Sequence, residues 1–193
     1  MLKTINNIAD FLERELALSA DKKEILVYSL QILFLFCGTF LGILSVAFLV
    51  SRLWQDIFSE AIIASLTMAS YRFVSGGFHF KNFILCMIIS SLIPAGIAVL
   101  AVILVQQGLN LPTPGWWLAW LLMLGIAVFF APRPVEERPI GKKEAKKFKC
   151  LSIVMLTCWG IIINLLPPAI ALSVLIGLGI QTASIITGHA EGK

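Results

Sequence analysis

Charged residues are scarce in this chain. Asp, Glu, Lys and Arg together make up 13% of its 193 residues, about half the share that is usual in a soluble domain. None of them occurs in residues 25–51, 83–132 or 150–188. Because about 20 apolar residues in a helix cross the hydrocarbon core of a bilayer, each of these runs is long enough for at least one transmembrane helix. The lack of charge excludes a soluble globular protein and predicts an integral membrane protein.

Histidine and cysteine are also few, with two His and four Cys in the whole chain. The cysteines, at positions 37, 86, 150 and 158, form no Cys-x-x-Cys pair, and such pairs are typical of zinc sites. The net charge of +4 is accompanied by no RNA-binding or DNA-binding motif. We therefore expect no metal, no cofactor and no nucleic-acid partner.

The apolar runs divide into six predicted transmembrane helices. Polar residues, Pro and Gly split the second run at 106–115, and Pro167 with Pro168 splits the third, because proline interrupts a helix. A further segment is less apolar, since it carries acidic residues near its start and Arg72 near its end. Such charges can reach the membrane interfaces. The predicted spans are residues 25–50, 54–73, 82–105, 115–131, 150–166 and 168–187. They predict one all-α membrane domain, 1–193, whose six-span helical bundle occupies residues 25–187.

The charges between the spans indicate the orientation of the bundle. With six spans, one side of the membrane receives the N-terminus, residues 74–81 with Arg72 at their border, the loop 132–149 and the C-terminus. That side holds 14 of the 15 Lys and Arg residues, and Arg52 is alone on the other. Because positive loops stay in the cytoplasm, both termini and the basic loop 132–149 are predicted to be cytoplasmic.

The first 24 residues predict an amphipathic helix on the cytoplasmic side. Apolar side chains recur there with helical period, at positions 2, 5, 8, 9, 12 and 16, and polar residues occupy most of the opposite face. Two placements fit this pattern. The helix lies on the inner membrane surface, or it packs against the cytoplasmic face of the bundle.

Residues 72–86 carry the candidate catalytic chemistry. His79 precedes Cys86 by seven residues, and an imidazole with a thiol is the minimum equipment for cysteine-based acyl transfer. On one continuous helix the two would lie about 10 Å apart along the axis, too far for direct proton transfer. We therefore expect the helix to break at Gly76-Gly77, and Asn82 to cap a new helix with Cys86 in its first or second turn.

Other residues near this pair are candidates for supporting roles. Ser75 and Asn82 are candidates to orient His79 or to donate to an oxyanion, and Arg72 to hold a substrate carboxylate. A purely structural interpretation is also open, in which Cys86 is a small apolar core residue and His79 an interfacial one. The spacing alone does not decide between these interpretations.

The run Arg72…Gly76-Gly77-Phe-His79…Cys86 resembles the motif of the accessory gene regulator B (AgrB) family, which are bacterial membrane cysteine peptidases of quorum sensing. The resemblance covers the whole chain, and it includes the length, the amphipathic start, about six spans and a basic loop with Ala-Pro…Pro-Ile elements, here from Ala131 to Ile140. One difference is Phe80, where alanine is frequent in the family.

The resemblance implies a defined reaction in the bacterial cell membrane, with the active site on the cytoplasmic side. Family members cleave the C-terminal part from a small AgrD-type precursor peptide. Cys86 would be the nucleophile that holds the remaining peptide as a thioester, and His79 the general base and acid. An internal thiol or hydroxyl of the peptide then closes a thiolactone or lactone ring, which gives the quorum-sensing autoinducing peptide. Gly76, Gly77 and Arg72 would support the site. The resemblance leaves open whether the protein forms a homodimer.

The basic loop has two interpretations. It marks the cytoplasmic side and does no more, or it attracts an acidic peptide tail or anionic lipid; the resemblance favours the peptide, because precursors of this family carry an acidic C-terminal region. The residues concerned are Arg133, Arg138, Lys142, Lys143, Lys146 and Lys147. Two other functions compete with the peptidase. They are a small membrane transporter or channel, which the near absence of ionisable residues in the spans disfavours, and a non-catalytic membrane scaffold, in which Cys86 would be dispensable.

Overall fold

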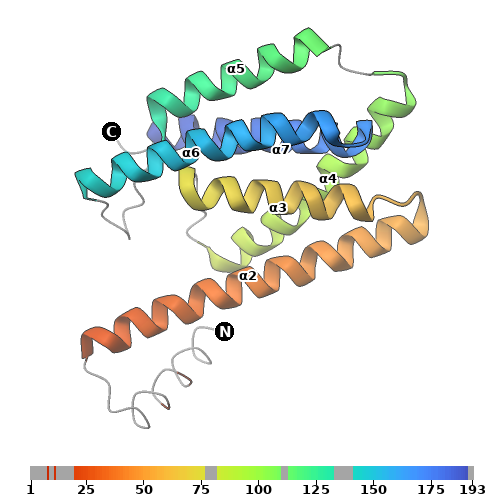
Figure 1. Ribbon diagram of the computed structural model, residues 1–193. Helices are drawn as coiled ribbons and strands as arrows, with labels where there is room; N and C mark the ends of the chain where they lie inside the picture. The colour runs from red at the N-terminus through yellow and green to blue at the C-terminus, as the bar shows by residue number, and fades with distance from the viewer. Residues whose placement is uncertain are drawn as a thin grey trace.

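The computed structural model describes residues 8, 11, 20–76, 82–109, 113–132 and 141–190, and in these ranges all regular structure is helical. The prediction of an all-α membrane protein is therefore confirmed. Most of the predicted amphipathic helix, residues 1–24, lies outside the described residues. The elements are α2 (Ala20–Leu53), α3 (Phe58–Ser75), α4 (Phe83–Gln106), α5 (Thr113–Phe130), α6 (Lys142–Ile162), the short 3-10 helix η1 (Ile163–Leu165) and α7 (Pro168–Ala190) (Figure 1).

The six α-helices coincide with the six predicted spans. Four contain segments long and apolar enough to cross a bilayer, namely Ser29–Leu53, Ile84–Gln106, Lys143–Leu165 and Pro168–Ile186. In α5 the apolar part is shorter, Pro114–Phe130. The 18-residue α3 is less apolar because it carries Glu60 in its first turn and Arg72 in its last.

The largest difference from the predicted bounds lies at the start of α6. Helix α6 begins at Lys142, so the last part of the basic segment 132–149 is helical and not a loop. The reason is local: lysine, glutamate and alanine favour a helix, and neither Pro nor Gly follows Gly141 until Gly160. The amide of Ala145 donates to the carbonyl of Gly141 at 2.9 Å and closes the first turn.

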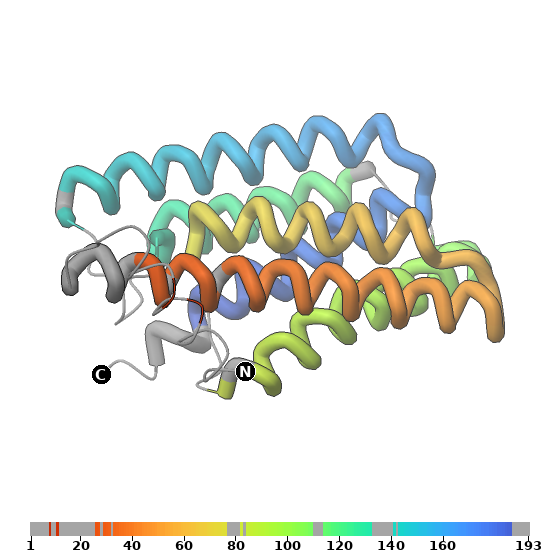
Figure 2. Tube along the Cα trace, turned by 90° about the horizontal axis from the view of Figure 1, so that it is seen from below, coloured from red at the N-terminus to blue at the C-terminus, as the bar shows by residue number. Residues whose placement is uncertain are grey.

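Consecutive helices run in opposite directions, so the bundle has two ends (Figures 1 and 2). The starts of α2, α4 and α6 and the ends of α3, α5 and α7 lie toward one side, and we call this the Cys86 end. The ends of α2, α4 and α6 and the starts of α3, α5 and α7 lie toward the other, which we call the Trp54 end. Helix α7 packs against α3, α4 and α5, and α4 crosses the bundle obliquely between α2 and α7.

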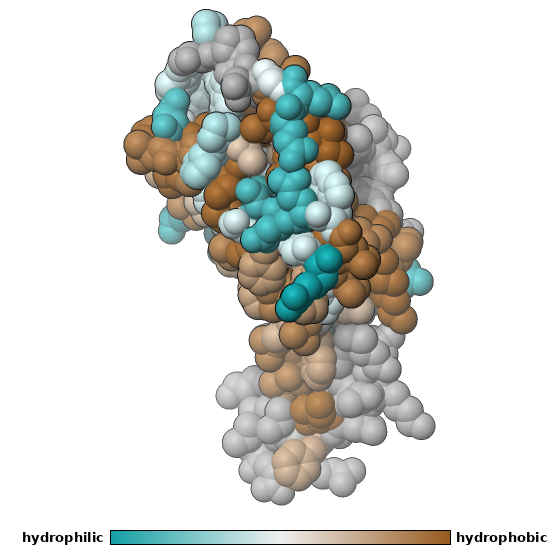
Figure 3. Space-filling view, turned by 90° about the vertical axis from the view of Figure 1, so that its right-hand side faces the viewer, coloured by the Kyte–Doolittle hydropathy of each residue, from teal (hydrophilic) through white to brown (hydrophobic). Residues whose placement is uncertain are grey.

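The helices bury small and apolar side chains between them and expose large apolar ones outside. One core cluster joins α3, α5, α6 and α7, with Tyr71, Met123, Leu156 and Leu178 among its members. Phe36, Leu41, Leu118, Leu122 and Phe129 are among the large apolar side chains that stay exposed. An apolar outer surface would be costly in water and suits lipid. Seen from the Trp54 end, hydrophilic residues gather in the upper part of the view, and hydrophobic residues lie beside and below them (Figure 3), as expected where a bundle meets the membrane interface.

Helices α2 and α4 make an unusually close contact through Gly38 and Gly42 of α2. A Cβ atom added at Gly38 would overlap the sulfur of Met87, and one added at Gly42 would overlap the hydroxyl of Ser91. The Ser91 hydroxyl lies 3.2 Å from the carbonyl oxygen of Thr39 on α2. A Gly-x3-Gly pair in an apolar helix is typical of such close packing in membranes. The contact fixes the first half of α4, the helix that carries Cys86.

Candidate functional site

The helix break that the sequence predicts at the two glycines is present. Helix α3 ends at Ser75, and Gly76 adopts φ 71° and ψ −157°, a region of backbone conformation that is essentially restricted to glycine. The Gly76 amide still donates to the carbonyl of Arg72 at 2.9 Å. Gly77 and His79 lie outside the described residues, so the contact between His79 and Cys86 stays a prediction.

The carbonyl oxygen of Gly76 accepts hydrogen bonds from two buried side chains. The Ser75 hydroxyl donates at 3.1 Å, and the Gln181 side-chain amide, from the distant helix α7, donates at 2.8 Å. Ser75 is fully buried and Gln181 is 2% exposed. Ser75 therefore helps to hold the backbone at the end of α3 by bonding to the Gly76 carbonyl. Gln181 was not predicted as a site residue, although it is one of only two side-chain amides in the charge-free run 150–188.

Asn82 caps the next helix, as predicted from the sequence. Its side-chain oxygen accepts from the amides of Ile84 at 3.0 Å and Leu85 at 3.3 Å. Its backbone carbonyl accepts from the amide of Cys86 at 2.9 Å, which puts Cys86 in the first turn of α4. The positive end of the helix dipole therefore lies near the thiol.

Cys86 differs from the other three cysteines in its surroundings. Its side chain is buried, whereas Cys37, Cys150 and Cys158 are exposed on the outer surface. The guanidinium of Arg72, in the last turn of α3, interacts electrostatically with Cys86. Two helices thus bring a thiol and a positive charge together at one end of the bundle. Burial and a nearby cation are compatible with a catalytic thiol, although burial alone is also usual for structural cysteines.

Part of the predicted basic surface lies at the same end. Lys143, Lys146 and Lys147 are exposed in the first turns of α6, and their spacing puts them on one face of the helix. Lys142 is the first residue of α6. Arg133 and Arg138 lie outside the described residues. The lysines of α6 and the buried Cys86 therefore lie at the same end of the bundle.

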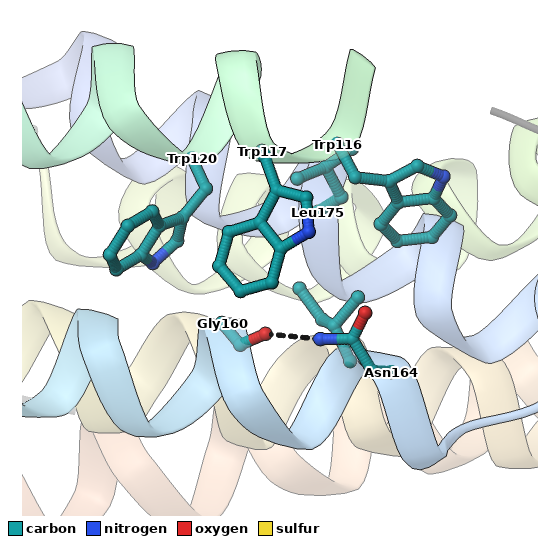
Figure 4. Close-up of a pocket in the computed structure, with 7 residues that line it drawn as sticks. Trp116, Trp117, Trp120, Gly160, Asn164 and Leu175 are labelled. Atoms are coloured by element: carbon teal, nitrogen blue, oxygen red, sulfur yellow. Dashed lines mark hydrogen bonds between the residues drawn. The ribbon is translucent and has the colours of Figure 1, made fainter. Parts of the chain in front are cut away.

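A small pocket lies toward the Trp54 end, between α5, α6 and α7 (Figure 4). Its lining consists of Trp116, Trp117, Trp120, Gly160, Ile163, Asn164 and Leu175. Two of its polar groups are already used, since the Asn164 amide donates to the Gly160 carbonyl at 2.8 Å and the Trp120 indole to the Leu156 carbonyl at 3.0 Å. The pocket offers no nucleophile, and its tryptophans suit the membrane interface.

Comparisons with known proteins agree with the motif. The family model for accessory gene regulator B matches residues 5–185, a range that contains all of residues 72–86. An AgrB-like protein of Clostridium beijerinckii is 28% identical over 176 residues, which are 89% of this chain and 82% of that protein. No solved structure matches this chain.

Proposed function

Because this chain belongs to the accessory gene regulator B family, we propose that it is a membrane-embedded cysteine endopeptidase that acts on an AgrD-type precursor peptide. Family membership ties the protein to peptide processing in the accessory gene regulator system, and its helices make it a multi-pass membrane protein. The observation that carries the proposal is the position of Cys86. It is a buried thiol in the first turn of α4, beside a cation, and it follows the segment that contains His79.

In the proposed reaction His79 removes the proton from the Cys86 thiol as the sulfur attacks the scissile carbonyl carbon of the precursor. The C–N bond then breaks, and His79 returns the proton to the leaving amine. The C-terminal fragment departs and the rest of the peptide stays on Cys86 as a thioester. An internal thiol or hydroxyl of the peptide gives its proton to His79, attacks the thioester and closes the ring, and the Cys86 thiolate leaves and is reprotonated.

The site needs a group to stabilise the negative charge of the tetrahedral intermediate. The amides of Ile84, Leu85 and Cys86 are already bonded to Asn82. Arg72 is the described cation that interacts with Cys86, so we assign this stabilisation to its guanidinium. This role differs from the one expected from the sequence, where Arg72 was a candidate to hold a substrate carboxylate.

Burial of the thiol also supports ring closure. Cys86 is 4% exposed, and its neighbours in sequence are Leu85 and Met87. A thioester held in such surroundings is shielded from bulk water. The internal nucleophile of the peptide then competes with little hydrolysis, which is what cyclisation requires.

The basic face of α6 is proposed to receive the acidic region of the precursor. Lys143, Lys146 and Lys147 are exposed at the Cys86 end, and Arg133, Arg138 and Lys142 are close to them in sequence. In the proposed orientation both termini, this face and the active site are cytoplasmic, because 14 of the 15 basic residues belong to that side.

A cleavage assay in liposomes tests this function. The wild-type protein and Cys86→Ala are reconstituted with an AgrD-type precursor, and mass spectrometry measures the released C-terminal fragment and the acyl-enzyme. We expect both from the wild type, with an adduct that hydroxylamine removes, and neither from Cys86→Ala. Cys150→Ala is the matched control, because Cys150 is exposed and lies outside the site, and it should cleave normally. Equal cleavage by Cys86→Ala would refute the proposal. It would favour the interpretation that this motif has only a structural role.

A further inference from the structure

Gln181 is an unusual residue for the interior of a membrane helix. It is 2% exposed on α7 and follows the apolar stretch Leu175–Ile180. A buried amide without a partner is costly in an apolar environment, so its partner indicates what the residue is for. Most buried hydroxyls of these helices bond to a carbonyl of their own helix, as Ser173 and Thr182 do. The Gln181 amide instead donates across the bundle to Gly76 at 2.8 Å.

Both backbone polar groups of Gly76 are hydrogen-bonded, and the contact with Gln181 involves its carbonyl. Its amide donates to Arg72, and its carbonyl accepts from Ser75 and Gln181. A carbonyl oxygen has two lone pairs, so the two side chains together satisfy it. Since φ of 71° is already confined to glycine, the direction in which the chain leaves α3 is determined by several independent constraints.

The same chain is also fixed on the other side of His79. Asn82 is held by its capping bonds, and its carbonyl is bonded to the amide of Cys86. His79 is three residues from Gly76 and three residues from Asn82, and three residues span at most about 11 Å. A change at either fixed residue is therefore at most three residues away from His79 along the chain.

We propose that Gln181 is a positioning residue that sets His79 relative to Cys86 by holding the carbonyl of Gly76. The inference rests on the proposed His79–Cys86 pair. In this proposal Gln181 acts through its hydrogen bond to Gly76 and not on the substrate directly. Its loss should leave precursor binding intact and lower the rate of the chemical step, because small displacements of a catalytic group are expensive: about 1 Å can reduce a rate on the order of 100-fold.

The test compares Gln181→Met, which keeps the length of the side chain but cannot donate, with Ser173→Ala on the same helix. Ser173 is buried and bonds only within α7, so it controls for the loss of a buried polar group. We expect Gln181→Met to lower kcat for cleavage about 10- to 100-fold with KM within about two-fold, and Ser173→Ala to change neither. Ser75→Ala removes the other donor to Gly76 and should lower kcat in the same direction, which keeps the test readable if Gln181→Met folds poorly.

Alkylation of Cys86 separates positioning from general damage. In a protein with Cys37, Cys150 and Cys158 replaced by alanine, the iodoacetamide rate reports Cys86 alone. Gln181→Met should slow this rate when His79 is present and leave it unchanged in a His79→Ala background, because Gln181 acts through His79. An equal slowing in both backgrounds, or no slowing in either, would overturn the inference. If His79→Ala itself leaves cleavage intact, the proposed function fails as well, so the two failures are distinguishable.

Discussion

The two ends of the bundle contain similar structural features in different surroundings. Each end has a glycine with positive φ, Gly76 at the Cys86 end and Gly108 at the Trp54 end. Each also has a hydrogen bond that a glutamine side chain donates to a residue just beyond the end of another helix. Gln181 is buried and reaches Gly76 at 2.8 Å in a partly buried position, whereas Gln106 reaches Gln55 at 2.6 Å in an exposed position.

The difference between the ends lies in burial and in the residues that follow. At the Cys86 end the fixed glycine leads into the segment of His79, and the next helix carries the buried Cys86 in its first turn. At the Trp54 end Gly108 is exposed and tryptophans surround the connections. Hydrogen bonds contribute little where water competes and more where it does not. The glycine and the glutamine bond should therefore affect catalysis at the Cys86 end and at most stability at the Trp54 end.

The largest expected effect comes from Gly76→Ala. Alanine at φ 71° and ψ −157° costs about 1–3 kcal/mol, and relief of this strain would redirect the chain toward His79. We expect cleavage to fall on the order of 100-fold. Gly108→Ala is the control, because φ there is 80° and an added Cβ meets no atom within 4 Å. Its thermal stability should fall while its cleavage rate stays normal. Equal activity losses in the two variants would show that the ends do not differ.

The next effect concerns the α2–α4 contact. In Gly42→Ala the new methyl group would overlap the Ser91 hydroxyl, so the helices must separate at a cost of about 1–3 kcal/mol. We expect a lower melting temperature in detergent and a cleavage rate reduced about 10-fold, since α4 carries Cys86. Gly96→Ala on α4 is the matched change, because no atom lies within 4 Å of its added Cβ. A normal rate in Gly42→Ala would mean that α4 tolerates the displacement.

A smaller effect should follow reversal of charge on α6. Lys143, Lys146 and Lys147 changed together to Glu should raise KM for an acidic precursor about 10-fold at low salt, and the difference should shrink as salt screens the charges. The alkylation rate of Cys86 should not change. Arg52→Glu, an exposed reversal at the Trp54 end, serves as the control and should leave KM unchanged. Precursor binding that is the same at every ionic strength would refute the role of this face.

The sequence predicted the parts of this structure that depend on local chemistry. The charge-free runs located five of the six helices, and the less apolar segment 54–73 located the sixth. The glycines and Asn82 located the break before Cys86, because the conformational freedom of glycine and the capping preference of asparagine act within a few residues. The start of α6 was missed, since the positive charges of residues 142–149 were interpreted as a loop although the same residues favour a helix.

The contacts between distant helices could not be predicted in the same way. Gly38 and Gly42 form a recognisable Gly-x3-Gly pair, but the pattern does not say which helix approaches it. Gln181 is visible as an isolated amide in an apolar run, and its partner is 105 residues away. Such pairings depend on how the helices pack, and local preferences contain no information about that.

The smallest effect is expected from Gln106→Met, which sharpens the comparison between the two glutamines. The bond from Gln106 to Gln55 is exposed, so water can replace it, and its loss should change the free energy of unfolding by about 0.5 kcal/mol or less. Cleavage should stay at the wild-type rate, whereas the same substitution at Gln181 should lower it. The two variants are compared by kcat and by thermal unfolding in one detergent. If both slow cleavage equally, glutamine bonds support the bundle in general, and the distinct role of the Cys86 end would have to be abandoned.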